Sequence, residues 1–183
     1  MRIMISILTA TISFFCLLNH VAGQEQPNSV RATLNSSPLQ ITLVTEKHRY
    51  KRNDDISFRV MVLNQDLRDI FIFGNLEWGY YASLTLCVQD ARGKTISPNF
   101  LPDAITNFDN PDDTSQFVKL LPFHFFGKEY NTSTARLNIQ KPGRYSIYAE
   151  YHSPISRAKV NVKPFFGKED GIVPSNTISI EIE

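Results

Sequence analysis

Apolar and polar residues alternate in five segments of the chain, from residue 39 to the carboxyl end. A period of two places every second side chain on the same face of a strand, so each segment is expected to bury one face. The alternating apolar positions are Leu39, Ile41 and Leu43; Ile56, Phe58, Val60 and Val62; Leu84, Leu86 and Val88; Tyr145, Ile147, Ala149 and Tyr151; and Ile178, Ile180 and Ile182.

Turn-forming residues separate these segments, and no long stretch shows a helical stripe. RNDD precedes the second segment, DARGK follows the third as a hairpin turn, and KPGR starts the fourth. In the fourth, Gly143 suits a tight turn, and Tyr145 can bury its ring and bond to nearby backbone as a tyrosine corner. The pattern predicts an all-β, antiparallel, immunoglobulin-like sandwich of seven to nine strands over residues 39–183.

The first 38 residues lack this alternation. Residues 1–23 combine the basic Arg2, an apolar run and the small-residue motif VAG, and together these features predict a cleaved signal peptide. Residues 24–38 are polar and aperiodic, which predicts a flexible amino-terminal lead. We therefore expect a secreted or periplasmic protein without a membrane span.

Charge and cysteine content narrow the classes of partner. The chain has 19 Lys and Arg against 18 Asp and Glu, a balance that gives no electrostatic footprint for nucleic acid. We expect a protein or glycan partner, recognised by shape and local chemistry, and no cofactor. Cys87 is the only cysteine after the signal, and its alternating segment favours a packed thiol over a nucleophile.

Four segments contain residues that are typical of the framework of a known group of domains, and the resemblance covers most of the chain after the signal. The segments are KHRYKRNDDISFRVMVLNQD, LTLCVQDARGK, KPGRYSIYAEY and VPSNTISIEI. They resemble immunoglobulin-like bacterial sandwich domains, including intracellular proteinase inhibitors and macroglobulin-type domains. The resemblance implies a fold more than an activity, and an export signal departs from an intracellular inhibitor role. The matching residues are Tyr50, Asp55, Phe58, Val60, Asn64, Asp90, Gly93, Pro142, Gly143 and Tyr145.

Aromatic residues outside the alternating segments are the main candidates for binding. The string FFGKE occurs twice, at 125–129 and 165–169, before an expected strand around ARLNI and before the final strand. The two Phe pairs meet at one pole of a simple Greek key, unless SRAKVNV forms a strand of its own. These rings either cap the open ends of the sandwich or form an exposed platform. The candidates are Trp78, Tyr80, Tyr81, Phe125, Phe126, Phe165 and Phe166.

Residues with the potential for chemistry are scattered. His48, His124 and His152 lack the close spacing of many metal sites. His152 and Ser153 are adjacent, so on a continuing strand they point to opposite faces and are poorly placed for a catalytic triad. The acidic segment PDAITNFDNPDDTS offers Asp109, Asp112 and Asp113 as calcium ligands, with a solvated loop as the alternative.

The sequence is compatible with three functions. The first is a secreted, non-catalytic binding or accessory module that presents aromatic loops to a protein or glycan. The second is a proteinase inhibitor with an exposed loop, for which Lys128 and Lys168 in the two FFGKE copies are the candidate residues. The third is a hydrolase with an unrecognised site; the absence of a G-x-S-x-G elbow places it last.

Overall fold

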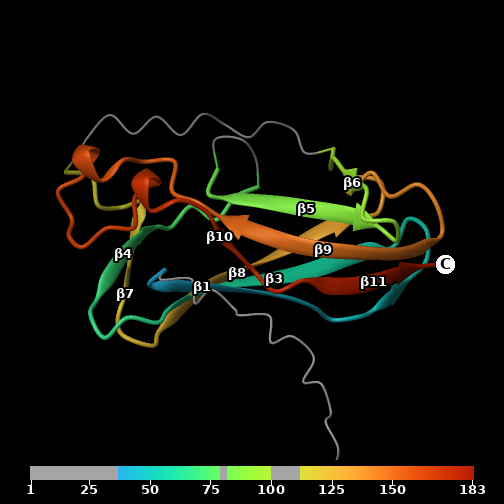
Figure 1. The fold of residues 1–183 in the computed structure, drawn as a ribbon, viewed down its shortest axis with the longest axis horizontal. Helices are drawn as coiled ribbons and strands as arrows, with labels where there is room; N and C mark the ends of the chain where they lie inside the picture. The colour runs from blue at the N-terminus through green and yellow to red at the C-terminus, as the bar shows by residue number, and fades with distance from the viewer. Residues whose placement is uncertain (1–36, 79–81, 100–111) are drawn as a thin grey trace, which may run out of the picture. The chain divides into compact units, whose positions relative to one another are not determined.

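The computed structural model describes residues 37–78, 82–99 and 112–183, which fold into two main β-sheets and a short third sheet (Figure 1). Two 3₁₀ helices, η1 (Arg157–Lys159) and η2 (Lys168–Asp170), lie near the third sheet. The strands are β1 (Leu39–Thr45), β2 (Arg49–Tyr50), β3 (Asp55–Asn64), β4 (Ile70–Phe73), β5 (Leu84–Asp90), β6 (Thr95–Ile96), β7 (Phe117–Leu120), β8 (Phe125–Ser133), β9 (Gly143–Tyr151), β10 (Val173–Pro174) and β11 (Ile178–Ile182).

The strand order is that of an immunoglobulin-like sandwich. One sheet has the order β1-β3-β8, and the other has the order β2-β11-β9-β5-β6, with β10 added beside β9. In immunoglobulin domains a sheet that contains strands A, B and E faces a sheet that contains strands G, F and C. Here β1, β3 and β8 correspond to A, B and E, and β11, β9 and β5 correspond to G, F and C. The predicted all-β antiparallel sandwich is confirmed, and eight strands of the described residues have four or more residues.

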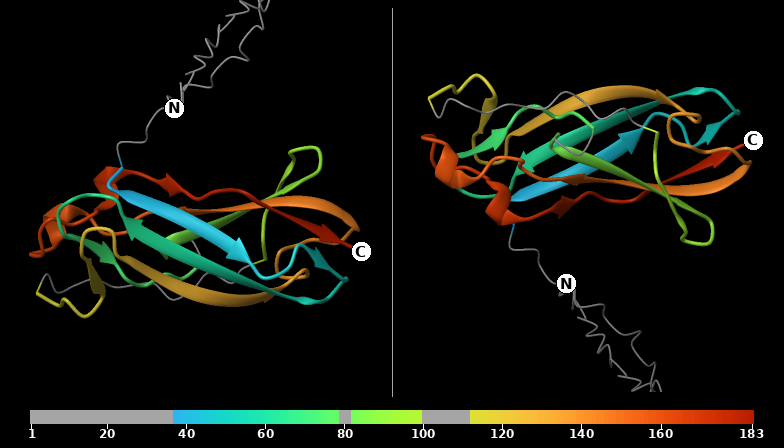
Figure 2. Two further views of the ribbon diagram at one scale, coloured as in Figure 1. Left: turned by 90° about the horizontal axis from the view of Figure 1, so that it is seen from below. Right: turned by 90° about the horizontal axis from the view of Figure 1, so that it is seen from above.

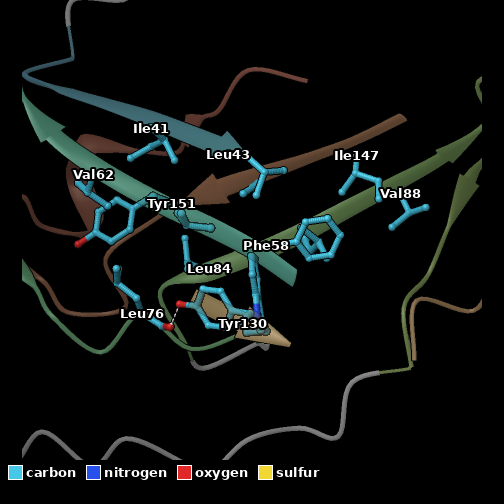
Figure 3. Packing of buried hydrophobic residues seen from close by; sticks show 14 of the residues in the cluster. Ile41, Leu43, Phe58, Val62, Leu76, Leu84, Val88, Tyr130, Ile147 and Tyr151 are labelled. Atoms are coloured by element: carbon cyan, nitrogen blue, oxygen red, sulfur yellow. Dashed lines mark hydrogen bonds between the residues drawn. The ribbon is translucent and has the colours of Figure 1, made fainter. Parts of the chain in front are cut away.

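The core lies between the two main sheets, and the predicted alternation identifies the residues that fill it. In β3 the side chains of Ile56, Phe58, Val60 and Val62 are completely buried, while the residues between them are less buried or exposed. Strands β1, β5, β9 and β11 alternate in the same way, and their inner side chains meet those of β3 (Figure 3). Full burial of each large apolar side chain contributes roughly 2 kcal/mol to folding.

Two predicted turns are confirmed. The Asp90 side chain accepts hydrogen bonds from the N–H groups of Arg92 and Lys94, both at 2.9 Å, in the hairpin between β5 and β6. Tyr145, near the start of β9, is buried and donates its hydroxyl proton to the Lys141 carbonyl at 2.7 Å. That bond is the predicted tyrosine corner, and it fixes the turn that enters strand F.

Two predictions about the FFGKE copies are wrong. The first copy is no loop, because residues 125–129 begin β8 and pair with β3. The segment ARLNI is no strand either. It forms turns after β8 in which the Leu137 N–H donates to the Ser133 carbonyl at 3.0 Å and the Ile139 N–H donates to the Thr134 carbonyl at 2.8 Å. Leu137 and Ile139 alternate because both are buried at the end of the core.

A second, smaller core lies under η1 and η2. It contains Phe73, Ile155, Val160 and Phe165, with the partly buried Phe117 packed against them. SRAKVNV lies in this region as η1 and turns, and forms no strand. Both FFGKE copies consequently lie toward the end of the sandwich that carries β4 and β7 (Figure 2).

The expected signal peptide lies outside the described residues, as does the expected lead except for its last two residues. Among the helices of the described residues, none is long and apolar enough to cross a membrane.

Candidate interaction site

The second FFGKE copy is part of the interior. Phe165 and Phe166 are both buried, with the Phe165 ring 5.1 Å from that of Phe117 and the Phe166 ring 5.8 Å from that of Tyr151. A parallel bridge between Phe71 and Phe165 fastens this segment to β4. Of the two alternatives for these rings, the packing role is confirmed for Phe165 and Phe166, and the exposed platform is wrong for both.

Trp78 is also buried, which corrects its interpretation as an exposed binding residue. Its ring centroid lies 4.4 Å from that of Tyr130, and the Tyr130 hydroxyl donates a hydrogen bond to the Leu76 carbonyl (Figure 3). The segment around Trp78 thus closes one side of the core. Tyr80 and Tyr81 lie outside the described residues.

Exposed apolar side chains gather instead on two loops and the start of β8. Leu67 is 78% exposed in the loop from β3 to β4, and Leu121 and Phe123 are 43% and 64% exposed in the loop from β7 to β8. Phe125, the first residue of β8, is 65% exposed, whereas Phe126 is partly buried against the core. We name Leu67, Leu121, Phe123 and Phe125 the apolar end patch.

The two loops of the patch are joined by one buried residue. Asn64, at the end of β3, donates from its side-chain amide to the carbonyl groups of Arg68 at 2.8 Å and Leu121 at 3.2 Å. The same amide also donates to the Leu120 carbonyl at 3.1 Å, and its oxygen accepts from the Asp66 N–H at 2.9 Å. The two amide hydrogens of Asn64 are thus shared among three carbonyl groups, and the side chain holds both loops in one arrangement.

The backbone of the second loop is fixed as well. Phe123 has a φ of 60°, which is uncommon for a large residue without a short polar side chain. Its N–H donates to the Asn64 carbonyl at 3.0 Å, and the N–H of the next residue, His124, donates to the Leu121 carbonyl at 3.1 Å. These bonds hold Phe123 with its ring in solvent, at a cost in backbone strain that is typical of functional sites.

The sequence contains a trace of this patch that pattern reasoning missed. Leu121, Phe123 and Phe125 alternate with Pro122 and His124, and such alternation normally indicates a strand with a buried face. In the structure the Pro-containing turn before β8 places all three side chains in solvent. Asn64 was recognised only as a framework residue.

The two candidate inhibitor lysines occupy different settings. Lys128 lies inside β8, where its ammonium group pairs with Glu77 and lies 5.5 Å from the centre of the Tyr130 ring. Its assignment to an exposed inhibitor loop is therefore wrong. Lys168 is exposed at the start of η2, beside a cleft of ≈ 620 Å³ that is also lined by Thr85, His152 and Ile172.

The adjacent His152 and Ser153 line the cleft beside Lys168 without forming a catalytic contact. Ser153 is buried, and its hydroxyl donates to the Ile155 carbonyl at 3.1 Å and accepts from the Ile155 N–H at 3.2 Å. Burial lowers the pKa of His152, although the charge of Glu150 opposes the shift. A neutral His152 beside a serine committed to a turn does not form a hydrolytic pair.

His48 and His124, the other two histidines in the described part of the chain, are exposed and separate. The Nδ1 atom of His48 hydrogen-bonds to the Ser179 carbonyl at 3.1 Å, and that of His124 to the Pro122 carbonyl at 3.0 Å. Within the described ranges, no three His, Cys, Asp or Glu side chains are grouped so that they could hold a metal ion.

Two of the calcium candidates are described. The Asp112 carboxylate accepts a hydrogen bond from the Asn161 side chain at 2.6 Å. Asp113 accepts from the Ser115 N–H at 2.9 Å, and its bonds to Ser115 lower its pKa. The third candidate, Asp109, lies outside the described residues.

Cys87 lies half-buried on the outer face of β5, opposite Tyr148 of β9. Burial raises the pKa of its thiol, and the neighbouring Glu150 adds to the shift, whereas a hydrogen bond with Tyr148 opposes it. A raised pKa keeps the thiolate fraction small, which disfavours a nucleophilic role.

Comparison with known proteins gives only distant likenesses. No protein-family model and no curated protein matches the chain. A solved structure of the CARDB domain of the PF1109 protein from Pyrococcus furiosus, in complex with di-metal ions, is 13% identical, with a TM-score of 0.36 over 79% of this chain and 91% of that one. The C-terminal domain of wzt is 8% identical, with a TM-score of 0.40 over 80% and 74%. Such low values leave function to be argued from the chain's own residues.

Proposed function

We propose that this chain is an exported, non-catalytic binding module that contacts a protein partner through the apolar end patch. The observation that carries the proposal is the exposure of Leu67, Leu121 and Phe123 on loops that Asn64 holds in place, next to the exposed Phe125 at the start of β8. Four large apolar side chains in water are unfavourable unless a partner covers them.

The chemistry of the patch favours a protein over a glycan. Its side chains are Leu and Phe, which carry no polar group to bond sugar hydroxyls. The cores of protein interfaces are depleted in charge and rich in aromatic residues, as this patch is. The fixed loops further lower the entropy that is lost when a partner binds.

Export is the second element of the proposal. It rests on the basic, apolar and small-residue segments of residues 1–23, in the order that a signal peptide requires. The lead of residues 24–38 then serves as a spacer between the processed end and the sandwich.

The proposal is tested by capture from the exported proteins of the producing organism, with the wild-type chain and the double variant Phe123→Ser/Phe125→Ser as baits. We expect a protein captured by the wild type to bind the double variant at least about tenfold more weakly, because buried aromatic anchors dominate interfaces. Ile172→Ser is the matched control, since Ile172 is similarly exposed but lies beside the Lys168 cleft. Equal capture by all three baits would contradict the proposal.

Protease inhibition is the second candidate function, and it now depends on Lys168 alone. Lys168 is exposed on a segment that is tightly tied: the Gly167 N–H donates to Asp170 at 2.8 Å, and Arg157 pairs with Asp170 at 3.0 Å. A rigid segment with an exposed basic side chain could occupy the specificity pocket of a protease that cleaves after basic residues, with little loss of entropy on binding.

A further inference from the structure

Strand β8 has one edge that no described strand pairs with. The sheet order β1-β3-β8 leaves β8 at the margin, and in the described ranges no strand takes the place that strand D holds next to strand E in a constant-type immunoglobulin domain. β8 is also long, with nine residues from Phe125 to Ser133. Long free edges are normally blunted or covered in soluble proteins.

The register shows which backbone groups of β8 face outward. The Asn64 N–H donates to the His124 carbonyl at 3.0 Å, and the Gln65 N–H donates to the Pro38 carbonyl at 2.7 Å. Even-numbered residues of β3 therefore bond toward β8, and odd-numbered ones toward β1. By the same alternation, the N–H and C=O groups of Phe125, Gly127, Glu129 and Asn131 point away from β3.

The opposite edge of the same sheet, on β1, is covered by other residues of the chain. The uncovered edge is therefore that of β8 in the described residues. On β1 the Leu43 N–H donates to the Asn176 side-chain oxygen at 2.9 Å, and the Asn176 amide donates to the Leu43 carbonyl at 3.0 Å. A parallel bridge between Ile41 and Ser175 covers the same edge two residues earlier in β1. Asn176 thus imitates a neighbouring strand on β1.

The charges on β8 are already neutralised within the chain. Glu129 pairs with Arg59 at 3.0 Å, and Lys128 pairs with Glu77. The Phe125 and Asn131 side chains on the outer face carry no charge, and Gly127 between them has no side chain. A strand that docks here meets no unpaired charge, so an uncharged segment suits this edge better than a charged one.

A groove adjoins the first residues of β8, and one of the residues that line it has a buried acceptor without a partner in the described part of the chain. It has a volume of ≈ 430 Å³ and is lined by Phe126 of β8, Val118 of β7 and Gln116, among others. The Oε1 atom of Gln116 is buried and has no hydrogen-bond partner within the described residues. An unpaired buried acceptor is costly, so the wall of this groove is a less stable part of the sandwich.

We propose that β8 binds an extended, uncharged and predominantly apolar peptide strand of a partner protein, which adds to the sheet as a fourth strand. The backbone of the incoming strand pairs with Phe125, Gly127, Glu129 and Asn131, and its side chains pack on Phe125 and along the groove beside Phe126. This inference rests on the proposed function and specifies the kind of segment that the partner presents.

The test uses random twelve-residue peptides displayed on phage and selected against the purified full chain. Enriched sequences should alternate apolar with neutral polar residues and lack Pro and charge in the central positions. A synthetic peptide of the enriched sequence should slow amide hydrogen exchange at Phe125, Gly127, Glu129 and Asn131 by about tenfold or more, since those amides gain partners. The amides of even-numbered β8 residues are the internal control, because β3 already pairs with them.

A second measurement avoids the risk that an edge variant fails to fold. Methylation of alternate backbone nitrogens of the peptide removes its donors without changing the protein. The peptide methylated at the pairing nitrogens should bind about tenfold more weakly or worse, while the peptide methylated at the intervening nitrogens should bind as before.

Three results would overturn the inference. One is that the selection enriches no binding peptide, and another is that the enriched peptide binds without protecting the four β8 amides. The third is that two copies of the chain pair through β8, which would make a second copy the occupant. The peptide could bind without protecting the four amides while the Phe123→Ser/Phe125→Ser variant loses the protein that the wild type captures. In that case the proposed function stands, and only the addition of a strand to β8 is refuted.

Discussion

The side chain of Asn64 donates a hydrogen bond to the backbone carbonyl of Leu121 at 3.2 Å, across 57 positions of sequence. This contact links the end of β3 to the loop before β8, and it joins a buried polar residue to a residue whose apolar side chain is exposed. The shape of the apolar end patch therefore depends on an interior amide, and the stability of the sandwich and the arrangement of this patch are coupled.

Replacement of Asn64 with Ala should destabilise the fold by about 3 kcal/mol. The change leaves the carbonyl groups of Arg68, Leu120 and Leu121 without this donor, and unsatisfied buried groups are costly. Urea unfolding measures the effect. Asn131→Ala is the control, because Asn131 is exposed on β8 and its loss should change stability by less than about 0.5 kcal/mol. Equal stability of the two variants would refute the role of Asn64 as the link between the loops.

Tyr130→Phe tests the closure of the core by the segment around Trp78. The variant keeps the ring contact but leaves the Leu76 carbonyl without its buried donor, so we expect a loss of about 1.5 kcal/mol in unfolding free energy. Burial raises the pKa of Tyr130 far above its usual value, in keeping with a hydroxyl that stays protonated. Tyr148→Phe, on the outer face of β9, should cost less in the same denaturant titration. A larger loss from Tyr148→Phe would count against this picture.

Acid should weaken the contact between η1 and η2. The Ser156 hydroxyl and then the Arg157 N–H donate to the Glu169 carboxylate, and these bonds lower its pKa from 4.5 to about 2. A pKa that is lower in the folded state favours the folded form above the unfolded pKa, and this contribution disappears as the pH falls from 4.5 to about 2.

Glu169→Gln removes the titrating group. The difference in Tm between wild type and this variant should therefore be largest above about pH 5 and should shrink toward about pH 2. Ser156→Ala, which lacks the first donor, should show the same trend. A Tm difference that stays constant over this range would show that Glu169 does not respond as described.

The sequence was most informative where one physical rule acted alone. The alternation of Ile56, Phe58 and Val60 identified β3 because a strand buried on one face requires that period. Gly143 and Tyr145 were interpreted correctly for a similar reason, since the tyrosine corner is a local contact between residues four apart.

Prediction failed where distant contacts decide the outcome. Phe165 and Phe125 occur in the same string, yet the first is buried beneath η1 and η2 and the second lies in solvent. Local sequence cannot separate these cases, because the difference comes from β4 and β7, which cover one copy and leave the other at an edge that no described strand pairs with. The role of Asn64 was hidden for the same reason, as its acceptors at 120 and 121 are brought to it only by the fold.

Lys168→Ala separates the binding function from protease inhibition. If the chain is a non-catalytic binding module, the purified protein should not slow a panel of trypsin-like, subtilisin-like and papain-like proteases, and Lys168→Ala should behave as the wild type does. Residual protease activity at increasing chain concentration measures this. Inhibition that Lys168→Ala relieves would favour the inhibitor function instead.

The most direct test of the central claim is photo-crosslinking from the apolar end patch in the compartment where the chain resides. A benzophenone amino acid at position 123 should give a discrete crosslinked adduct with a protein, and the same group at position 172 should give none of that adduct, since Ile172 is exposed but remote from the patch loops in sequence. Absence of an adduct from position 123, or the same adduct from both positions, would contradict the claim that this patch is the binding surface.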